Sequence, residues 1–159
     1  MLFTMTSQLS AKLECVLKIA VQRAEAKAIY ISDRGGNILA VHTLKAIPME
    51  DNLSALAAGS FFATQELAKM IGEGGFQCVF HQGTNSSMYM QNLSNDMLML
   101  VVFGAESNPG LIRLYCGQAA RKVDGLFAAA EAANTNPSAQ FGSMFEIDDR
   151  AQPFTPSSP

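Results

Sequence analysis

The stretch AIYISDRGGNILAVH, residues 28–42, places a dense turn signal between two short runs of strand-forming residues. Residues 28–32 and 38–42 are apolar and contain several β-branched side chains, whereas residues 33–37 hold an Asp, two glycines and an Asn. Branched and aromatic side chains favour strands, and glycine supplies the positive φ that tight turns require. This stretch therefore predicts a β-hairpin.

Two helices are predicted on either side of the hairpin. Apolar residues recur at helical spacing over residues 7–25, and again from Asp51 to about Glu73, where two glycines follow. Ser7 or Ser10 is expected to cap the first helix, and Asp51 the second. The stripe of the second helix predicted to face the core is Leu53, Leu56, Ala57, Ser60, Ala63, Thr64, Leu67 and Ile71. The face predicted to point outward is Ala55, Ala58, Gly59, Phe62, Glu66 and Lys69.

Three further strands are predicted over residues 76–81, 87–93 and 97–103. The last is almost wholly apolar, which is typical of a central strand covered on both faces. Pro109 is expected to open a final helix that runs to about residue 133. The order α-β-β-α-β-β-β-α predicts an α/β fold, a three-layer sandwich with one five-stranded, mainly antiparallel sheet and helices on both faces.

The chain is predicted to divide into one domain, residues 1–133, and a C-terminal tail, residues 134–159. The tail is rich in Pro, Ser and Asn, a composition typical of a flexible segment. Residues 141–149 combine acidic and large apolar side chains. They are interpreted as part of the flexible tail, and a short docking motif is the alternative.

Composition excludes several classes of protein. The chain has 159 residues, a net charge of −3 and no run of basic residues, so nucleic acid is not expected as a partner. Cys15, Cys78 and Cys116 are widely spaced, which favours reduced thiols over disulfides or a zinc site. The first eight residues lack the features of a signal peptide, and no stretch approaches the ~18 apolar residues of a membrane span. A cytoplasmic protein without membrane insertion is expected.

Candidate catalytic residues are few. His42 and His81 each end a predicted strand and belong to no metal-binding motif. The nucleophile motif G-x-S-x-G and the phosphate-binding motif G-x-x-x-x-G-K-[ST] are absent. We therefore expect no catalytic site, metal or cofactor, and favour a binding module.

Two features predict a homodimer. Gly59 lies inside a helix, where glycine costs ~1 kcal/mol relative to alanine, and its neighbours on that face are small. The strand over residues 76–81 is expected at a sheet edge, where it can pair with a second copy. The predicted dimer interface is Ala55, Ala58, Gly59, Phe76, Cys78 and Phe80. A monomer whose tail covers this face is the alternative.

Six segments together resemble the Roadblock family, and within it the bacterial MglB-like proteins. They are DRGGNIL (33–39), LSALAAG (53–59), QELAKMIGE (65–73), FHQG (80–83), MYM (88–90) and GLIRL (110–114). The resemblance covers about residues 7–130. It implies a Roadblock fold, a homodimer, and an MglA-like small GTPase bound across the paired second helices.

The resemblance also implies a function and a set of site residues. MglB-like proteins promote GTP hydrolysis by rearranging the catalytic groups of the GTPase itself, without an arginine finger. Carried over by position, the partner surface comprises Gly59, Phe62, Ala63, Glu66, Lys69 and Met70. Phe62 and Glu66 replace smaller residues of the family, and Tyr115 to Gln118 replace its basic residues.

Three functional hypotheses follow. The first is a regulator that stimulates GTP hydrolysis in cell polarity or motility. The second is a dimeric scaffold that binds a GTPase or another signalling partner without accelerating hydrolysis. The third is an enzyme or small-ligand sensor, for which the sequence supplies no convincing set of ionisable groups.

Overall fold

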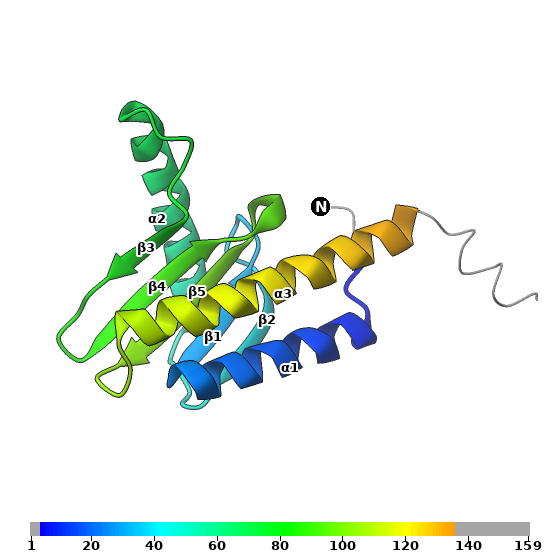
Figure 1. Ribbon diagram of the computed structural model, residues 1–159, viewed down its shortest axis with the longest axis horizontal. Helices are drawn as coiled ribbons and strands as arrows, with labels where there is room; N and C mark the ends of the chain where they lie inside the picture. Colours follow the sequence, from blue (N-terminus) through cyan, green and yellow to red (C-terminus); the bar gives the residue numbers. More distant parts are fainter. Residues whose placement is uncertain (1–3, 136–159) are drawn as a thin grey trace, which may run out of the picture.

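The computed structural model describes residues 4–135, which form three helices and five strands (Figure 1). In chain order these are α1 (Ser7–Ala24), β1 (Ala28–Ser32), β2 (Ile38–Thr43), α2 (Glu50–Met70), β3 (Cys78–His81), β4 (Ser86–Asn92), the 3₁₀ turn η1 (Ser94–Asp96), β5 (Leu98–Gly104) and α3 (Pro109–Thr135). The predicted α/β order is confirmed. The predicted C-terminal tail lies outside the described residues, except for Asn134 and Thr135, which belong to α3.

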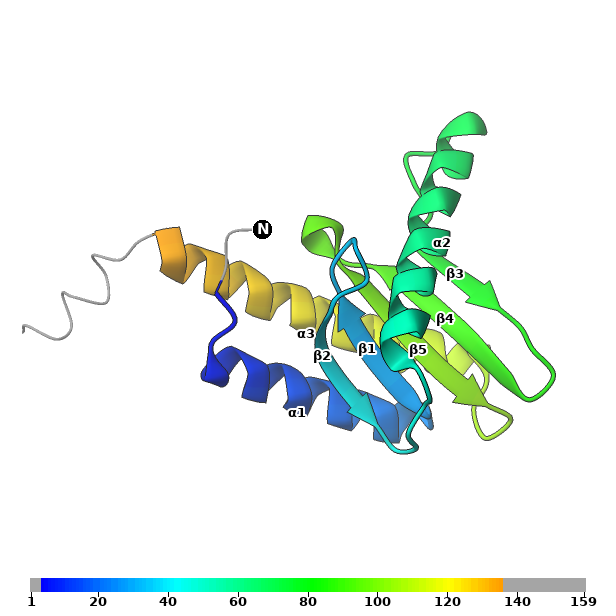
Figure 2. The ribbon, with the colours of Figure 1, turned by 180° about the vertical axis from the view of Figure 1, so that it is seen from behind.

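The strands form one sheet in the order β2-β1-β5-β4-β3, and every neighbouring pair is antiparallel. All seven residues of β5 are buried, as the apolar run predicted, because β5 is the central strand. The sheet is covered on both faces. Helices α1 and α3 lie side by side on one face, and α2 lies alone on the other (Figure 2).

The core is accordingly split into two clusters by the sheet. The larger cluster joins α1 and α3 to the sheet through residues such as Leu13, Ile29 and Phe127, all fully buried. The smaller cluster lies beneath α2 and includes Tyr30, Phe61 and Leu100. Successive strand residues point to opposite faces, so Ile29 and Tyr30 supply different clusters.

The hairpin between β1 and β2 is fixed by the side chain of Asp33. One carboxylate oxygen accepts hydrogen bonds from the backbone amides of Gly35 and Asn37, both at 2.9 Å. The other oxygen accepts one from the Asn37 side-chain amide at 2.8 Å. Partial burial alone would raise the pKa of Asp33, but these hydrogen bonds hold it below the ordinary 3.8. The predicted turn is therefore confirmed, with Asp33 as its organising side chain.

The prediction of which stripe of α2 faces the sheet is wrong in part. Ala57 is buried as expected, but Leu56, Ser60, Ala63, Leu67 and Ile71 are exposed. The fully buried residues include Ala58, which was expected to point outward, together with Ser54, Phe61 and Ala68. The small residues on this side let α2 approach the hairpin. A Cβ atom on Gly36 would lie only 2.4 Å from the Cα of Ala55.

The helix ends also differ from the prediction. Thr6, rather than Ser7 or Ser10, caps α1 by accepting a hydrogen bond from the Leu9 amide at 3.1 Å. Helix α2 begins at Glu50, with Met49 in the left-handed conformation before it, so Asp51 lies inside the first turn. Pro109 opens α3 as predicted, and the Asn108 side chain caps it through the Leu111 amide at 3.0 Å.

Candidate partner-binding surface

The outer face of α2 carries an apolar stripe that no described residue covers. We call Leu56, Gly59, Ser60, Ala63, Leu67 and Met70 the α2 stripe; all six are exposed. Each of them lies three or four residues from another of the set, so they lie along one side of the helix. Leu56 is 74% exposed, Leu67 57% and Met70 82%. Large apolar side chains in a contiguous row mark a surface that contacts another molecule.

The position of α2 on the sheet makes this stripe accessible. The helix crosses the sheet near the hairpin, and its C-terminal end rises beyond the strands in both views (Figures 1 and 2). Ile71, which follows the helix, is 71% exposed there. The half of α2 around Leu67 and Met70 therefore projects from the body of the molecule.

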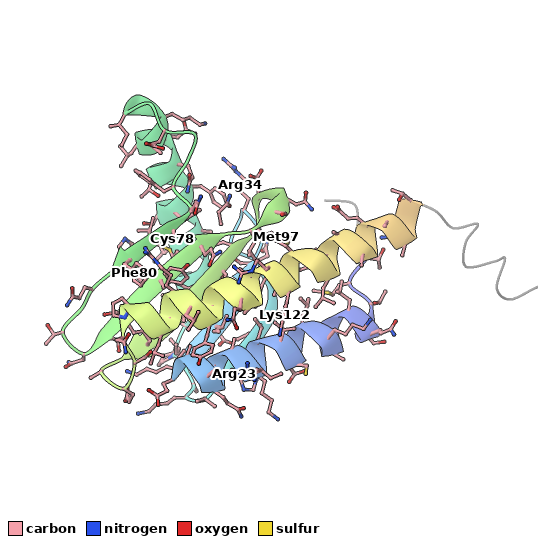
Figure 3. All side chains as sticks on the ribbon, in the orientation of Figure 1. Arg23, Arg34, Cys78, Phe80, Met97 and Lys122 are labelled. Atoms are coloured by element: carbon pink, nitrogen blue, oxygen red, sulfur yellow. The ribbon has the colours of Figure 1, made fainter. Side chains whose placement is uncertain are left out.

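Beside the stripe, Phe62 is held by Arg34 from the hairpin turn. The guanidinium carbon of Arg34 lies 4.5 Å from the centre of the Phe62 ring, a cation–π contact. Arg34, which Figure 3 labels, also reaches Asp96 in η1, with a closest N–O distance of 3.5 Å. Phe62 is half-buried and packs edge-on against Phe61, whose ring centre is 5.6 Å away. The turn, the helix and η1 are thereby joined at one place.

The next turn of α2 adds a charged pair. Lys69 donates a hydrogen bond to Glu66 at 2.7 Å. This hydrogen bond and the charge of Lys69, with a smaller effect of Arg34, lower the pKa of Glu66. Both side chains are largely exposed, so the pair presents adjacent negative and positive charges to a partner.

The edge of the sheet adjoins α2 through Gln65. Its side-chain amide donates to the Phe76 carbonyl at 3.0 Å, and its oxygen accepts from the Phe76 amide at 2.8 Å. Phe76 is thus bound to the helix and does not join the sheet, so β3 starts at Cys78 and not at residue 76 as predicted. Because Gln65 uses both its polar atoms on one residue, it fixes the distance between α2 and β3.

Strand β3 is an edge strand, as predicted. Within residues 4–135 it pairs with β4 alone, so its outer backbone groups have no strand beside them. Phe80 contacts the ring of Tyr89 on β4, with ring centres 4.7 Å apart. The Arg113 guanidinium lies 5.7 Å from the Phe80 ring centre and 3.7 Å from the Cys78 sulfur. Arg113 therefore links α3 to the β3 edge, where Figure 3 shows Cys78 and Phe80.

The predicted site residues fall into three groups. Gly59, Ala63, Glu66, Lys69 and Met70 are exposed on α2, and Phe62 is half-buried beside them. Cys78 and Phe80 lie on the β3 edge, with Phe76 just before it. Ala55 is exposed at the hairpin end of α2. Ala58 is fully buried against the sheet, so it cannot contact a partner.

Sequence reasoning missed two kinds of contributor to this surface, two leucines of α2 and an arginine of the hairpin turn. Leu56 and Leu67 were assigned to the core, because an apolar residue at helical spacing is ordinarily buried. Arg34 was treated as part of a turn, and its contact with Phe62 joins residues far apart in the chain. A signal did exist for the first error, since both sides of α2 carry apolar residues and only one can face the sheet.

Ionisable groups do not converge in the part of the chain that the structure describes. His42 and His81 lie on β2 and β3, the two opposite edges of the sheet. No group of three or more His, Cys, Asp or Glu side chains among residues 4–135 could hold a metal ion. Burial raises the pKa of the Cys116 thiol to about 12, which keeps it protonated. None of the described helices is long and apolar enough to span a membrane.

Comparisons with known proteins support the fold described above. Residues 12–103 match the family model described as the Roadblock/LC7 domain. The gliding protein MglB of Thermus thermophilus superposes with a TM-score of 0.75 at 28% identity, over 82% of this chain and 97% of that one. MglB of Myxococcus xanthus gives 0.73 at 26% identity, over 79% and 93%. A Roadblock/LC7 domain of Streptomyces avermitilis gives 0.66 at 17% identity, over 72% and 97%, and shows the fold alone. No sequence among curated proteins matches significantly.

Proposed function

The chain belongs to the Roadblock/LC7 family, and on that premise we propose that it is a homodimeric regulator of a small Ras-like GTPase of the MglA type. It has no catalytic site of its own in this proposal. One observation carries it: the α2 stripe stays exposed beside the free edge of β3, in a chain similar to MglB proteins along most of its length. The proposed setting is cell polarity or motility, in keeping with the name of the Thermus relative.

Two copies associate through this region in the proposal. The β3 edges pair antiparallel, which satisfies the outer N–H and C=O groups and extends the sheet across both copies. The two α2 helices then lie side by side. Burying a side chain such as Leu56 or Leu67 contributes about 1.5–3 kcal/mol when burial is complete. Gly59 allows close approach, since among residues 4–135 nothing beyond the adjoining residues and backbone of α2 lies within 4 Å of where its Cβ would be.

The GTPase binds across the paired helices. Its proposed contacts are Gly59, Phe62, Ala63, Glu66, Lys69 and Met70. Phe62 is fixed in place by Arg34, so little conformational freedom is lost when a partner covers it. The Glu66–Lys69 pair offers opposite charges in a fixed order along the helix, which can set the orientation of the partner.

Stimulation of hydrolysis needs no catalytic group from this chain. A regulator that binds the hydrolysis-competent conformation of the GTPase more tightly shifts its population by that difference in affinity. Arg34 and Arg113, which lie beside this surface, already contact Phe62 and Phe80 within the chain. Rearrangement of the GTPase's own groups is therefore proposed, rather than insertion of an arginine into its site.

The test is single-turnover GTP hydrolysis by an MglA-type GTPase from the same organism, with and without an excess of this protein, alongside a binding assay. Acceleration that saturates with concentration supports a GTPase-activating protein. Binding without acceleration supports a scaffold instead. Failure to bind in either nucleotide state contradicts the proposal.

A charge exchange on α2 sharpens the binding test. The double variant Glu66→Lys/Lys69→Glu keeps an ion pair and the net charge but reverses the order of the charges. It should weaken GTPase binding about tenfold or more, equivalent to ~1.4 kcal/mol. Glu14→Lys/Lys18→Glu makes the same exchange at exposed positions of α1 and should leave the affinity unchanged.

A further inference from the structure

Two hollows lie along the outer seam between α1 and α3, on the sheet face opposite α2. The first is shallow, about 40 Å³, and its apolar floor includes Val16, Ile19 and Tyr115. The second, of about 340 Å³ and bordered by Leu126 and Ala130, lies toward the N-terminus of α1, and we call the two together the α1–α3 groove. The lining residues of α1 recur every three or four positions, as do those of α3, so the two hollows lie in line along one seam.

The rim of this groove is basic. Arg23 and Lys122 border one end, and Lys12 borders the other. Figure 3 shows Arg23 and Lys122 on the neighbouring helices. No ion pair joins any of the three to a carboxylate within residues 4–135, and neither hollow has an acidic residue in its lining. The acidic residues of α3 are engaged on another side, where Asp124 accepts from the Ser94 amide and Glu131 from the Asn95 side chain.

An occupant of this groove should therefore be apolar and acidic. The chain itself contains such a segment, which begins six residues after the end of α3. Residues 141–149 read FGSMFEIDD, with Phe141, Phe145 and Ile147 near the carboxylates of Glu146, Asp148 and Asp149. We propose that residues 141–149 dock in the α1–α3 groove of the same chain, with the aromatic side chains on its apolar floor and the carboxylates at Lys122 and Arg23.

The geometry of α3 allows this return. Helix α3 ends at Thr135, beside the hollow bordered by Ala133, and rises ~20 Å between Lys122 and Thr135. Residues 136–145 can span up to ~33–36 Å when extended, which is enough to bring Glu146 beside Lys122. Phe141 then comes within reach of Leu126. The covalent link gives a docked segment an effective concentration on the order of millimolar, so weak contacts suffice.

A second copy of the chain is a poorer occupant. Two copies stacked through the same face would bring Lys12, Arg23 and Lys122 of each toward those of the other. Like charges brought together without intervening carboxylates oppose association. Charge complementarity thus favours the acidic segment.

The test uses the full chain with a nitroxide on Ser143→Cys. Cys15 and Cys78 are replaced by Ser, and the buried Cys116 remains. Amide signals of residues 12–23 and 115–126 should lose intensity through proximity to the label, whereas those of α2 should keep it. High salt should restore the signals, because exposed charges are screened.

Matched charge reversals decide the outcome. Arg23→Glu/Lys122→Glu should lower the equilibrium constant for docking about tenfold, because two ion pairs are lost together. Lys18→Glu/Arg121→Glu changes the net charge equally, at exposed positions outside both hollows, and should leave the broadening intact. Circular dichroism verifies that both variants fold.

Three results would overturn the proposal. One is the absence of broadening in the α1–α3 groove of the parent chain. Another is broadening that survives Arg23→Glu/Lys122→Glu at low salt. The third is broadening that appears only between labelled and isotopically enriched molecules in a mixture, which would assign the groove to a neighbouring copy. None of these outcomes depends on GTPase binding.

Discussion

The guanidinium of Arg34 lies 4.5 Å from the centre of the Phe62 ring, and this contact joins the β1–β2 turn to the outer side of α2. Phe62 of the proposed partner surface also packs edge-on against Phe61, whose ring centre is 5.6 Å away. The contact thus couples the stability of the hairpin to the shape of the surface.

A double-mutant cycle measures this coupling. Arg34→Ala and Phe62→Leu should each lower the free energy of unfolding, and their coupling energy should be about 0.5–1 kcal/mol, typical of an exposed cation–π pair. Arg34→Lys keeps the charge opposite Asp96 but loses the planar stacking, so it should behave nearly as Arg34→Ala does. Urea denaturation of the single and double variants gives the energies. A coupling near zero would mean that the two side chains are merely adjacent.

Leu67→Glu should convert the proposed dimer to a monomer at micromolar concentration, because a carboxylate would be buried where two α2 stripes meet. Leu67 is 57% exposed, so the fold of each copy should be little affected. Leu114→Glu, at a residue 52% exposed on α3, is the control and should remain dimeric. Sedimentation equilibrium distinguishes the states. A parent chain that sediments as a monomer would contradict the edge-pairing argument.

Gly59→Leu should weaken association without lowering the stability of the subunit. The interior of a helix favours leucine over glycine by somewhat less than the ~0.8–1 kcal/mol by which it favours alanine, and no described residue outside α2 crowds the Cβ position of Gly59. The free energy of unfolding of the isolated subunit should therefore not fall, whereas dimer or GTPase affinity should. If affinity is unchanged, no molecule approaches the helix closely at this point.

Gly36→Ala should destabilise the fold by more than about 2 kcal/mol, because the residue has φ +85° and its new Cβ would lie 2.4 Å from the Ala55 Cα. Gly125→Ala on α3 is the matched change in open space, and should stabilise the protein by about 0.5–1 kcal/mol. Thermal or urea denaturation compares them. If the two variants instead change the free energy of unfolding by the same amount, α2 does not pack tightly against the hairpin.

The hairpin should also lose stability in acid. The folded-state pKa of Asp33 lies below its ordinary 3.8, so the charged carboxylate stabilises the fold above that pH. This contribution is lost as pH falls through the lowered pKa, when the folded state also takes up the proton. The stability difference between the parent and Asp33→Asn should therefore be constant well above pH 3.8 and shrink as the pH falls below it. A difference that persists at low pH would assign the effect to packing rather than charge.

Local chemistry was enough to predict the order of elements. Asp33 and the glycines after it specify the hairpin whatever surrounds them, and the apolar run ending at Phe103 has to be covered on both faces. Pro109 could begin a helix but not continue one. The edge position of β3 followed from the same reasoning.

The sequence by itself determined the helical periodicity of α2. Only the tertiary structure decided which of its two apolar sides meets the sheet. Leu56 and Leu67 have the same spacing as core residues, yet they are exposed, because Ala57, Ala58 and Phe61 fit beneath the helix where Gly36 brings the hairpin against Ala55. Periodicity reports that a side is apolar but not what lies opposite it. The contacts of Arg34 with Phe62 and of Gln65 with Phe76 were likewise decided by tertiary packing, since they join segments whose separation in the chain carries no local signal.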